Sequence, residues 1–300
     1  MMVRYIVSEA LAAMPARAFL QKQLGMSLHL WRRIKHSGTF CRNGKLENPA
    51  LTILQPGDEI TYDLAESTRL LPLNIPLDIR YEDDALLIVN KPAGQLVYPT
   101  SDAAEPTLAN AVLGYYQRTG QSLIFHPVHR LDRNTSGLIL IAKLPQIQYQ
   151  LTRNEMKRFQ RNYIAIVTGH PEPASGWIDA PIARQPESTI QRMVSPEGKP
   201  ALTRYETLTA NKYGALVFLT LKTGRTHQIR VHLAHIGCPL LGDDLYGGNR
   251  DIISRQALHA CQIQLQHPVS QQPLNIYCPP PADMANIIAT FPKISAPFLY

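Results

Sequence analysis

HRLDRNTSGLILIA, at residues 129–142, joins a polar loop directly to an apolar run. The run at residues 138–142 has the length and composition of a buried strand. The loop before it, residues 129–137, lies where a rigid scaffold commonly presents reactive groups. The stretch therefore predicts a sheet-based domain in which Asp132, at the edge of one strand, is the candidate reactive carboxylate.

Further short apolar runs predict that strands dominate the chain from residue 77 to residue 300. Helical periodicity appears between them in a few places, and the irregular spacing of the runs argues against a repeated β-α-β unit. We therefore expect an α+β domain built on a mixed, mainly antiparallel sheet. The predicted strands are 85–89, 137–142, 163–168, 216–221 and 258–265, and the predicted helices are 107–118, 146–158 and 226–236.

Residues 1–64 predict a separate, small α+β module. Residues 65–76 lose periodicity and contain Pro72 and Pro76, so we interpret them as a linker between the two domains. The signals within the module are helices at 15–25 and 28–36, with Ser27 as N-cap of the second, turns at Asn43-Gly44 and Pro56-Gly57-Asp58, and a strand at 59–63.

Positive charge is concentrated in this module. The chain has a formal net charge of +7, and residues 15–45 contain seven Lys or Arg and no Asp or Glu. Such a concentrated positive field suits a phosphate backbone, so the module is a candidate RNA-binding platform. The candidate RNA-binding residues are Arg17, Lys22, Arg32, Arg33, Lys35, Arg42 and Lys45.

The sequence gives no support for a metal-binding protein or for a membrane protein. The four cysteines, Cys41, Cys238, Cys261 and Cys278, are far apart and have no zinc-site spacing, so reduced and mostly buried thiols are expected. The apolar run 10–13 is too short for a signal peptide, and no stretch has eighteen apolar residues. We therefore expect a cytoplasmic protein that needs no metal and does not span a membrane.

A second polar cluster, residues 223–233, contains a further charged candidate. His227 and His232 are five residues apart, which is one too many for the face of a zinc-protease helix, and Gln228 replaces the glutamate base of that motif. Arg230 instead offers a permanent cation able to hold a buried Asp132 ionised. A kinase reading of the loop 129–137 fails, because no contiguous His-Arg-Asp, Asp-Phe-Gly or Gly-rich phosphate loop is present.

Several distinctive motifs follow one another along the chain. They are Asn90-Lys91-Pro92-Ala93-Gly94, the loop 129–137, Arg161-Asn162-Tyr163-Ile164-Ala165, Gly198-Lys199 with Ala201-Leu202-Thr203-Arg204-Tyr205, residues 224–232 and 239–243, and Leu258-His259-Ala260. In this order they make the sequence resemble the RluA-type pseudouridine synthases, a family that includes ribosomal RNA enzymes. The small domain at the amino terminus also resembles an RNA-binding domain found in a ribosomal small-subunit protein.

The resemblance implies a role for individual residues. Asp132 becomes the catalytic carboxylate, Arg230 its ion-pair partner, and Tyr163 the ring beneath the target base. Arg130 becomes a residue that helps to extrude the nucleotide, and Leu240 or Leu241 supplies an apolar wall. His129 and Arg225 are further candidates for substrate contacts. Two positions depart from the family pattern: Tyr98 stands where His is frequent, and Asn134 stands where Asp is common.

The implied reaction cleaves the bond between uracil and ribose, turns the base and rejoins it through a ring carbon. It needs no redox change and no group donor, so no cofactor is expected. An ionised carboxylate can act on the sugar either by forming an adduct or by abstracting a proton, and both routes stay open. Tyr163 is either a base for the ring-carbon proton or a stacking platform.

The substrate is expected to be structured RNA, with large-subunit ribosomal RNA first and transfer RNA second. A monomer is expected by default. The main alternative is a non-catalytic RNA-binding or ribosome-assembly factor on the same fold. A hydrolase that uses Asp132 with His129 is a further alternative, which release of free uracil would reveal.

Overall fold

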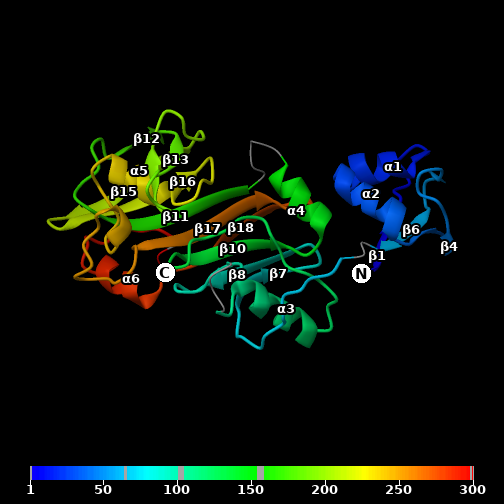
Figure 1. Cartoon of the computed structure of the whole chain (residues 1–300), viewed down its shortest axis with the longest axis horizontal. Coiled ribbons are helices and arrows are strands. Elements are labelled where there is room, and N and C mark those ends of the chain that lie inside the picture. The colour runs from blue at the N-terminus through cyan, green and yellow to red at the C-terminus, as the bar shows by residue number, and fades with distance from the viewer. Residues whose placement is uncertain (1, 64–65, 101–104, 154–158, 298, 300) are drawn as a thin grey trace.

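The computed structural model describes residues 2–63, 66–100, 105–153, 159–297 and 299. One large sheet runs through the body of the molecule, and the amino-terminal residues form a smaller unit at one end of it (Figure 1). Helices pack on both faces of the large sheet. The α+β architecture predicted from the sequence is therefore confirmed. Within the described part of the chain, no helix is long and apolar enough to cross a membrane.

The large sheet has the strand order β12-β15-β16-β11-β17-β10-β8-β7, with β18 paired to β17 and β9 paired to β10. Each predicted strand is present, with ends that differ by up to four residues. The bounds are β7 Asp78–Glu82, β8 Leu86–Lys91, β9 His126–Pro127, β10 Ser136–Ala142, β11 Phe159–Thr168, β12 Ser175–Asp179, β15 Leu202–Asn211, β16 Gly214–Leu221, β17 Leu258–Gln266 and β18 Pro273–Tyr277.

The pairing of the described strands is antiparallel with one exception, which lies where the polar loop enters β10. There Ser136 and Gly137 run parallel to His259 and Ala260 of β17. A Cβ atom on Gly137 would lie 2.4 Å from the carbonyl oxygen of Ala260, so only glycine permits this close approach. The start of β10 is thereby set against the start of β17.

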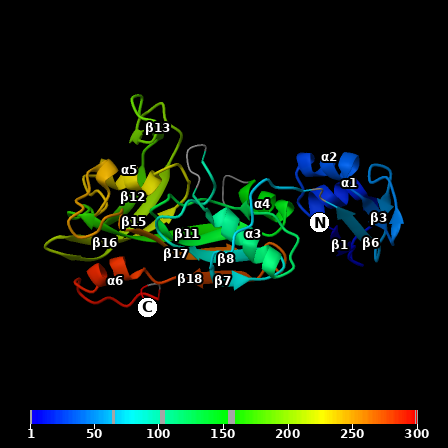
Figure 2. The same cartoon turned by 60° about the horizontal axis from the view of Figure 1, so that its bottom comes forward.

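The helices are divided between the two faces of the sheet. α3 (Leu108–Arg118) and α5 (Gln228–His235) share the core of one face with Tyr163 and Leu219. α6 (Ala282–Ile288) covers the opposite face through Met284 (Figure 2). Residues that alternate along β11 therefore face two different cores.

Two helices differ from their predicted bounds. The predicted helix 146–158 is α4, Pro145–Thr152, and its expected last five residues, 154–158, lie outside the described residues. The predicted helix 226–236 begins only at Gln228, because His227 has a φ of 58°. That left-handed conformation cannot continue an α-helix, so the residues before it form a turn.

The amino-terminal unit has its own sheet, in the order β1-β6-β3-β4, and its own hydrophobic core. Ser27 caps α2 as predicted, accepting a hydrogen bond from the amide of Leu30. The predicted helix 15–25 consists of a short α-helical and a π-helical segment. The bounds are β1 Met2–Ile6, β2 Met14–Pro15, α1 Ala16–Ala18, the π-helical turn Phe19–Gln23, α2 Leu28–Ser37, β3 Phe40–Arg42, β4 Lys45–Leu46, β5 Ile53–Leu54 and β6 Glu59–Asp63.

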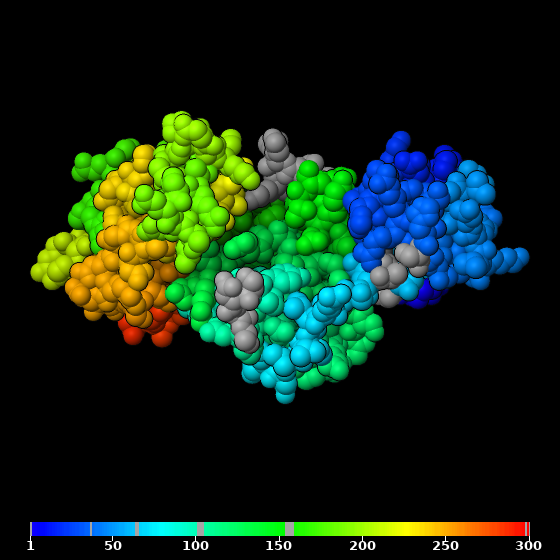
Figure 3. All heavy atoms as spheres, viewed as in Figure 1, coloured from blue at the N-terminus to red at the C-terminus, as the bar shows by residue number. Residues whose placement is uncertain are grey.

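Side chains of α4 contact this unit directly (Figure 3). The Gln150 amide donates a hydrogen bond of 2.6 Å to the carbonyl oxygen of Leu24. Gln146 donates to the hydroxyl of Tyr62 at 3.4 Å. Residues 66–76 contain no helix or strand, as their proline-containing sequence predicts.

Buried polar side chains hold the loop that enters β10. The Lys91 amino group, fully buried, donates to the carbonyl oxygens of Pro92, Gln95 and Arg133 at 2.7, 2.9 and 3.0 Å. Burial lowers the pKa of Lys91 to about 7, although the nearby Asp132 acts in the opposite direction. The loop is thus tied to the segment that follows β8.

Arg255 and His259 hold the same loop from the other side. Arg255 Nη1 donates to the carbonyl oxygen of Asn134 at 3.2 Å, while Nε and Nη2 bind Asp283 at 2.7 and 2.9 Å. His259 Nδ1 lies 2.9 Å from the Ser136 hydroxyl, and burial lowers the His259 pKa to about 4. A neutral ring with its proton on Nε2, facing the carbonyl oxygen of Cys278, accepts from Ser136.

The close approach at Gly137 predicts a difference between two glycine variants. Gly137 and Gly120 both have positive φ, but the φ of 113° at Gly137 lies farther from the left-handed helical region than the φ of 70° at Gly120, so alanine strains the backbone more at Gly137. A Cβ on Gly120 has no atom within 4 Å, whereas one on Gly137 meets β17. Gly137→Ala should therefore lower the free energy of unfolding by about 2 kcal/mol more than Gly120→Ala in urea denaturation. Equal losses would show that β10 can move away from β17 without cost.

The buried amino group of Lys91 predicts a pH dependence of the free energy of unfolding, which Lys91→Met should remove. The pKa of Lys91 is about 7 in the folded chain and 10.5 as its ordinary value. Between these values the folded chain has lost the proton, which leaves two N–H donors for the three carbonyl oxygens, while the unfolded chain keeps it. The group therefore makes the wild type more stable as pH rises, by up to about 1.4 kcal/mol per pH unit. Urea unfolding at several pH values from about 7 to 9 should show the free energy of unfolding of the wild type rising relative to that of Lys91→Met. A constant difference would contradict the lowered pKa.

Candidate active site

A cavity of about 200 Å³ opens where the loop 129–135, strand β11 and the turn before α5 meet. We call it the Asp132 cavity. Its polar lining includes Asp132, Arg161, Tyr163, His227 and Arg230. The two polar clusters that the sequence places almost a hundred residues apart thus form one site.

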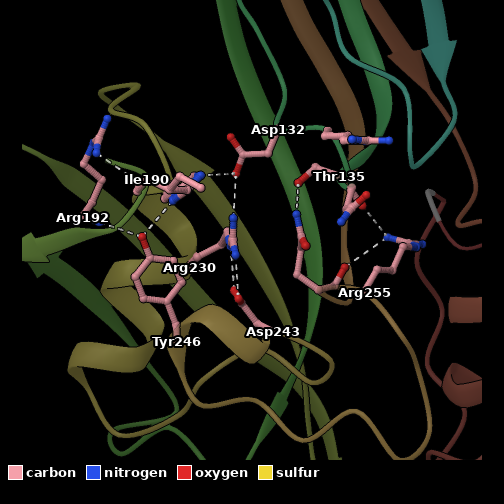
Figure 4. A network of polar contacts seen from close by, with 12 residues as sticks. Asp132, Thr135, Ile190, Arg192, Arg230, Asp243, Tyr246 and Arg255 are labelled. Carbon is pink, nitrogen blue, oxygen red and sulfur yellow. Dashed lines mark hydrogen bonds and ion pairs between the residues drawn. The ribbon is translucent and has the colours of Figure 1, made fainter. Parts of the chain in front are cut away.

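Asp132 lies at the rim of this cavity, and 19% of its side chain is exposed. Its Oδ2 atom is 3.6 Å from Nη1 of Arg230 and 3.9 Å from Nε2 of His227 (Figure 4). Its backbone carbonyl accepts a hydrogen bond from the amide of Thr135. The carboxylate is therefore held by a tight turn and remains accessible from the cavity.

Arg230 binds a second carboxylate more closely than it binds Asp132. Its Nε and Nη2 atoms donate to the two oxygens of Asp243, both at 2.7 Å (Figure 4). Burial lowers the pKa of Arg230, but the hydrogen bonds with Asp243 outweigh this effect and raise it above its ordinary value. The sequence indicated Asp132 as the ion-pair partner, and the structure adds Asp243 as the bidentate one.

Tyr163 lies on β11 and is 3% exposed. Burial raises the pKa of its phenol, while the neighbouring Arg161 opposes the rise. Arg161 itself is nearly buried, stacks over Phe159 at 5.5 Å and donates to the carbonyl oxygen of Thr223 at 3.1 Å. The cavity therefore contains a neutral aromatic ring next to a guanidinium group.

His227 connects the cavity to a neighbouring hairpin. Its Nδ1 atom lies 2.8 Å from the hydroxyl of Tyr246, in the 3₁₀ turn Asp244–Tyr246. The same hydroxyl accepts the backbone amide of Arg192 at 3.0 Å. Arg192 begins β14 (Arg192–Val194), which pairs with β13 (Ile182–Arg184). Burial lowers the pKa of His227, and the nearby Asp132 acts in the opposite direction.

The remaining substrate candidates fall into two groups. Arg130 and Arg225 are exposed at the cavity, and His129 stacks on Phe159 with its Nε2 accepting the amide of Leu140 at 3.1 Å. Leu240 and Leu241 are buried in hydrophobic cores on opposite faces of the sheet instead of lining the cavity. The apolar wall is made by Val128, Leu131, Leu221, Ile229 and Leu258.

The basic residues of the amino-terminal unit are not equivalent. Arg33 pairs with Glu66 at 3.4 Å, and Arg42 pairs with Glu47 at 2.9 Å. The others are exposed, on α1, the π-helical turn, α2 and β4: Arg17, Lys22, Arg32, Lys35 and Lys45.

Sequence reasoning missed several residues of the site. Asp243 lies in the motif 239–243, to which the sequence assigns no role. The spacing of His227 from His232 bears only on a metal site. Lys91, which continues the apolar run of β8, was part of a motif without a stated function. Arg255 and Tyr246 carry no local signal, because their partners come from distant segments. In the part of the chain that is described, no three His, Cys, Asp or Glu side chains gather to hold a metal.

Known proteins resemble this chain over most of its length. A family model described as RNA pseudouridylate synthase matches residues 85–235. The uncharacterized RNA pseudouridine synthase YjbO of Bacillus subtilis (strain 168) is 38% identical over 271 residues, covering 89% of this chain and 95% of that protein. The ribosomal large subunit pseudouridine synthase D of Escherichia coli (strain K12) is 38% identical over 263 residues, covering 82% and 80%.

Solved structures agree with these sequence matches. Human RNA pseudouridylate synthase domain containing 4 has a TM-score of 0.58 and 25% identity, covering 70% of this chain and 91% of that one. Human RNA pseudouridylate synthase domain containing 1 has a TM-score of 0.55 and 26% identity, covering 69% and 84%. The motifs, the sheet and the matches over most of the chain have one common explanation: this protein belongs to the RluA-type family of RNA pseudouridine synthases.

Proposed function

We propose that this enzyme isomerises uridine in large-subunit ribosomal RNA, with Asp132 as its catalytic carboxylate. The observation that carries the proposal is the position of Asp132: a partly exposed carboxylate at the rim of a cavity that also contains a buried aromatic ring. The ribosomal substrate is supported by the relatives named ribosomal large subunit pseudouridine synthase D.

Asp132 is arranged to act on the sugar of a nucleotide that enters the cavity. A carboxylate must be ionised either to attack ribose or to take a proton from it. Arg230, whose guanidinium is 3.6 Å away, favours the charged form of its neighbour. Because Asp243 holds two other nitrogens of the same guanidinium, the cation stays in place when the substrate displaces solvent.

Tyr163 serves as the platform for the base. Its ring lines the cavity, and the apolar wall around it includes Leu131, Leu221 and Ile229. Such walls retain the cleaved uracil while it turns, which keeps the second bond-forming step intramolecular. The buried phenol has a raised pKa and keeps its proton at neutral pH, so we assign it stacking and not proton abstraction.

Basic residues provide the contacts that nucleotide extrusion requires. Removing a base from its stack costs roughly a few kcal/mol. Arg130 and Arg225 are exposed at the cavity and are placed to contact the phosphates beside the extruded nucleotide. The exposed Arg32 and Lys35 on α2 offer a second cationic surface in the amino-terminal unit, which we propose binds RNA as a separate small domain.

Asp132→Asn is expected to abolish pseudouridine formation while RNA binding persists. The amide retains the size of the side chain but can neither attack ribose nor accept a proton from it. Carbodiimide primer extension on unmodified ribosomal and transfer RNA transcripts maps the product, with the exposed Asp244→Asn as the matched control. Stops that persist in Asp132→Asn would exclude Asp132 as the catalytic group. Stops on transfer RNA alone would overturn the ribosomal assignment.

Asp243→Asn should destabilise the fold much more than Asp244→Asn. The Asp243 side chain is fully buried against Arg230, whereas Asp244 is 64% exposed and pairs with Arg250 at the surface. Removing one partner of a buried ion pair costs about 3 kcal/mol or more, whereas an exposed pair contributes under about 1 kcal/mol. Urea denaturation of both variants measures the difference. Similar losses would mean that Arg230 is satisfied without Asp243.

A further inference from the structure

We propose that Tyr246 and His227 form a hydrogen-bond relay that directs an imidazole N–H at Asp132, so that both are positioning residues for the reaction. The inference rests on the role of Asp132 in the proposed function. The relay starts at the backbone amide of Arg192, passes through the Tyr246 hydroxyl and the His227 ring, and ends at Oδ2 of Asp132.

The direction of each hydrogen bond follows from the donor at the start of the relay. A backbone amide can only donate, so the Tyr246 oxygen accepts from Arg192 at 3.0 Å. Among the described residues, His227 Nδ1, at 2.8 Å, is the only other hydrogen-bond partner of the Tyr246 hydroxyl. The hydroxyl proton therefore has an acceptor in the protein only when Nδ1 is unprotonated. A neutral imidazole that accepts at Nδ1 carries its proton on Nε2. The Arg192 amide thereby sets the tautomer of His227.

The protonated nitrogen faces the reactive carboxylate. His227 Nε2 lies 3.9 Å from Oδ2 of Asp132, and Arg230 Nη1 lies 3.6 Å from the same atom. Both distances exceed the range of a hydrogen bond, so the relay requires them to shorten when the substrate binds, as catalytic hydrogen bonds often do. Two N–H groups at the start of α5 thus face the same carboxylate oxygen.

The charges around the ring favour the neutral form. Burial lowers the pKa of His227, and the guanidinium groups of Arg230 and Arg192 act in the same direction. Asp132 and Asp243 oppose this shift, which remains downward. A doubly protonated ring would also present an N–H to the Tyr246 oxygen, which would leave the hydroxyl proton without an acceptor among the described residues.

The backbone of His227 is a second, independent observation. Its φ of 58° and ψ of 19° lie in the left-handed region, which few residues other than glycine adopt, although histidine is found there more often than most. Glycine or asparagine would fit this conformation with less strain. Strain retained at a residue that lines a cavity indicates that the side chain is needed there.

Tyr246 connects the relay to Arg230 as well. The Arg230 guanidinium lies 5.0 Å from the centre of the Tyr246 ring, and the His227 ring meets the same tyrosine edge-on at 5.7 Å. Figure 4 shows Tyr246 between Arg192 and Arg230, with Asp132 beyond them. One tyrosine therefore packs against both groups that face the carboxylate, while only its hydroxyl takes part in the relay.

Tyr246→Phe tests the relay because it removes the hydroxyl and keeps the ring. We expect kcat to fall by about tenfold with KM and the unfolding temperature little changed, because the tautomer of His227 is no longer set. The rate is measured as tritium release from [5-³H]uridine in the RNA transcript that the mapping identifies, since ribose replaces the hydrogen on C5. An unchanged kcat, or a change confined to KM or to the unfolding temperature, would overturn the relay.

Two variants of His227 distinguish the contribution of its N–H donor from that of the imidazole ring. His227→Gln extends an amide N–H towards the position of Nε2, whereas His227→Asn fits the backbone better but is too short to reach Asp132. The relay therefore predicts more activity in His227→Gln than in His227→Asn, with the opposite order in stability. Tyr246→Phe should have little further effect on kcat in the His227→Gln background. The relay would be contradicted if the effects of Tyr246→Phe and His227→Gln on kcat multiplied in the double variant. Equal activities of His227→Gln and His227→Asn would also contradict it.

Nitrogen-15 NMR of the histidine rings gives a readout that does not depend on activity. The His227 signals, assigned by their loss in His227→Gln, should show the proton on Nε2 in the wild type and a mixture of tautomers in Tyr246→Phe. A proton on Nδ1 in the wild type would overturn the relay. Activity retained by Asp132→Asn would instead refute the proposed role of Asp132, so the two failures are distinguishable.

Discussion

The site depends on one constraint: the backbone of a loop that turns into a buried strand must find hydrogen-bond partners away from water. Lys91 donates to the carbonyl oxygen of Arg133 in this loop and to two carbonyl oxygens of the segment after β8. Arg255 reaches the carbonyl oxygen of Asn134 from the opposite side. A buried carbonyl without a partner costs free energy comparable to a lost hydrogen bond, so these contacts determine whether the loop has a single conformation. The position of Asp132 follows from them, because it lies directly before the carbonyl oxygens that are held.

Two carboxylates of the site, Asp243 and Asp132, share one cation, Arg230. Arg230 holds Asp243 through two short hydrogen bonds and faces Asp132 at a longer distance. Asp243 is fully buried and Asp132 is partly exposed, so one carboxylate fixes the cation and the other is available to the substrate. A guanidinium suits this double task because its five donors have a fixed planar geometry. Asp243 therefore anchors the cation that Asp132 uses.

The sheet brings these groups together from segments that lie up to about a hundred residues apart in the sequence. Asp132 precedes β10, Tyr163 lies on β11, and Arg230 lies on α5, which packs against the same face of the sheet. The parallel contact between β10 and β17, possible because Gly137 has no side chain, sets the loop beside Arg255 and His259. A cavity lined by a buried ring, a carboxylate and cations is what an enzyme needs to hold and turn a base without releasing it.

The sequence by itself predicted the strands, the turns and the candidates for the reactive groups. Apolar runs predict strands because a buried strand needs apolar side chains over its length, and the motifs around Asp132, Tyr163 and Arg230 lie in or next to such runs. Only the tertiary structure decided how the polar groups pair. Arg230 prefers Asp243 to Asp132, Leu240 and Leu241 belong to the core, and Tyr246 reaches His227 from a separate turn. These contacts depend on distances between segments far apart in the chain, and local pattern and propensity contain no information about them.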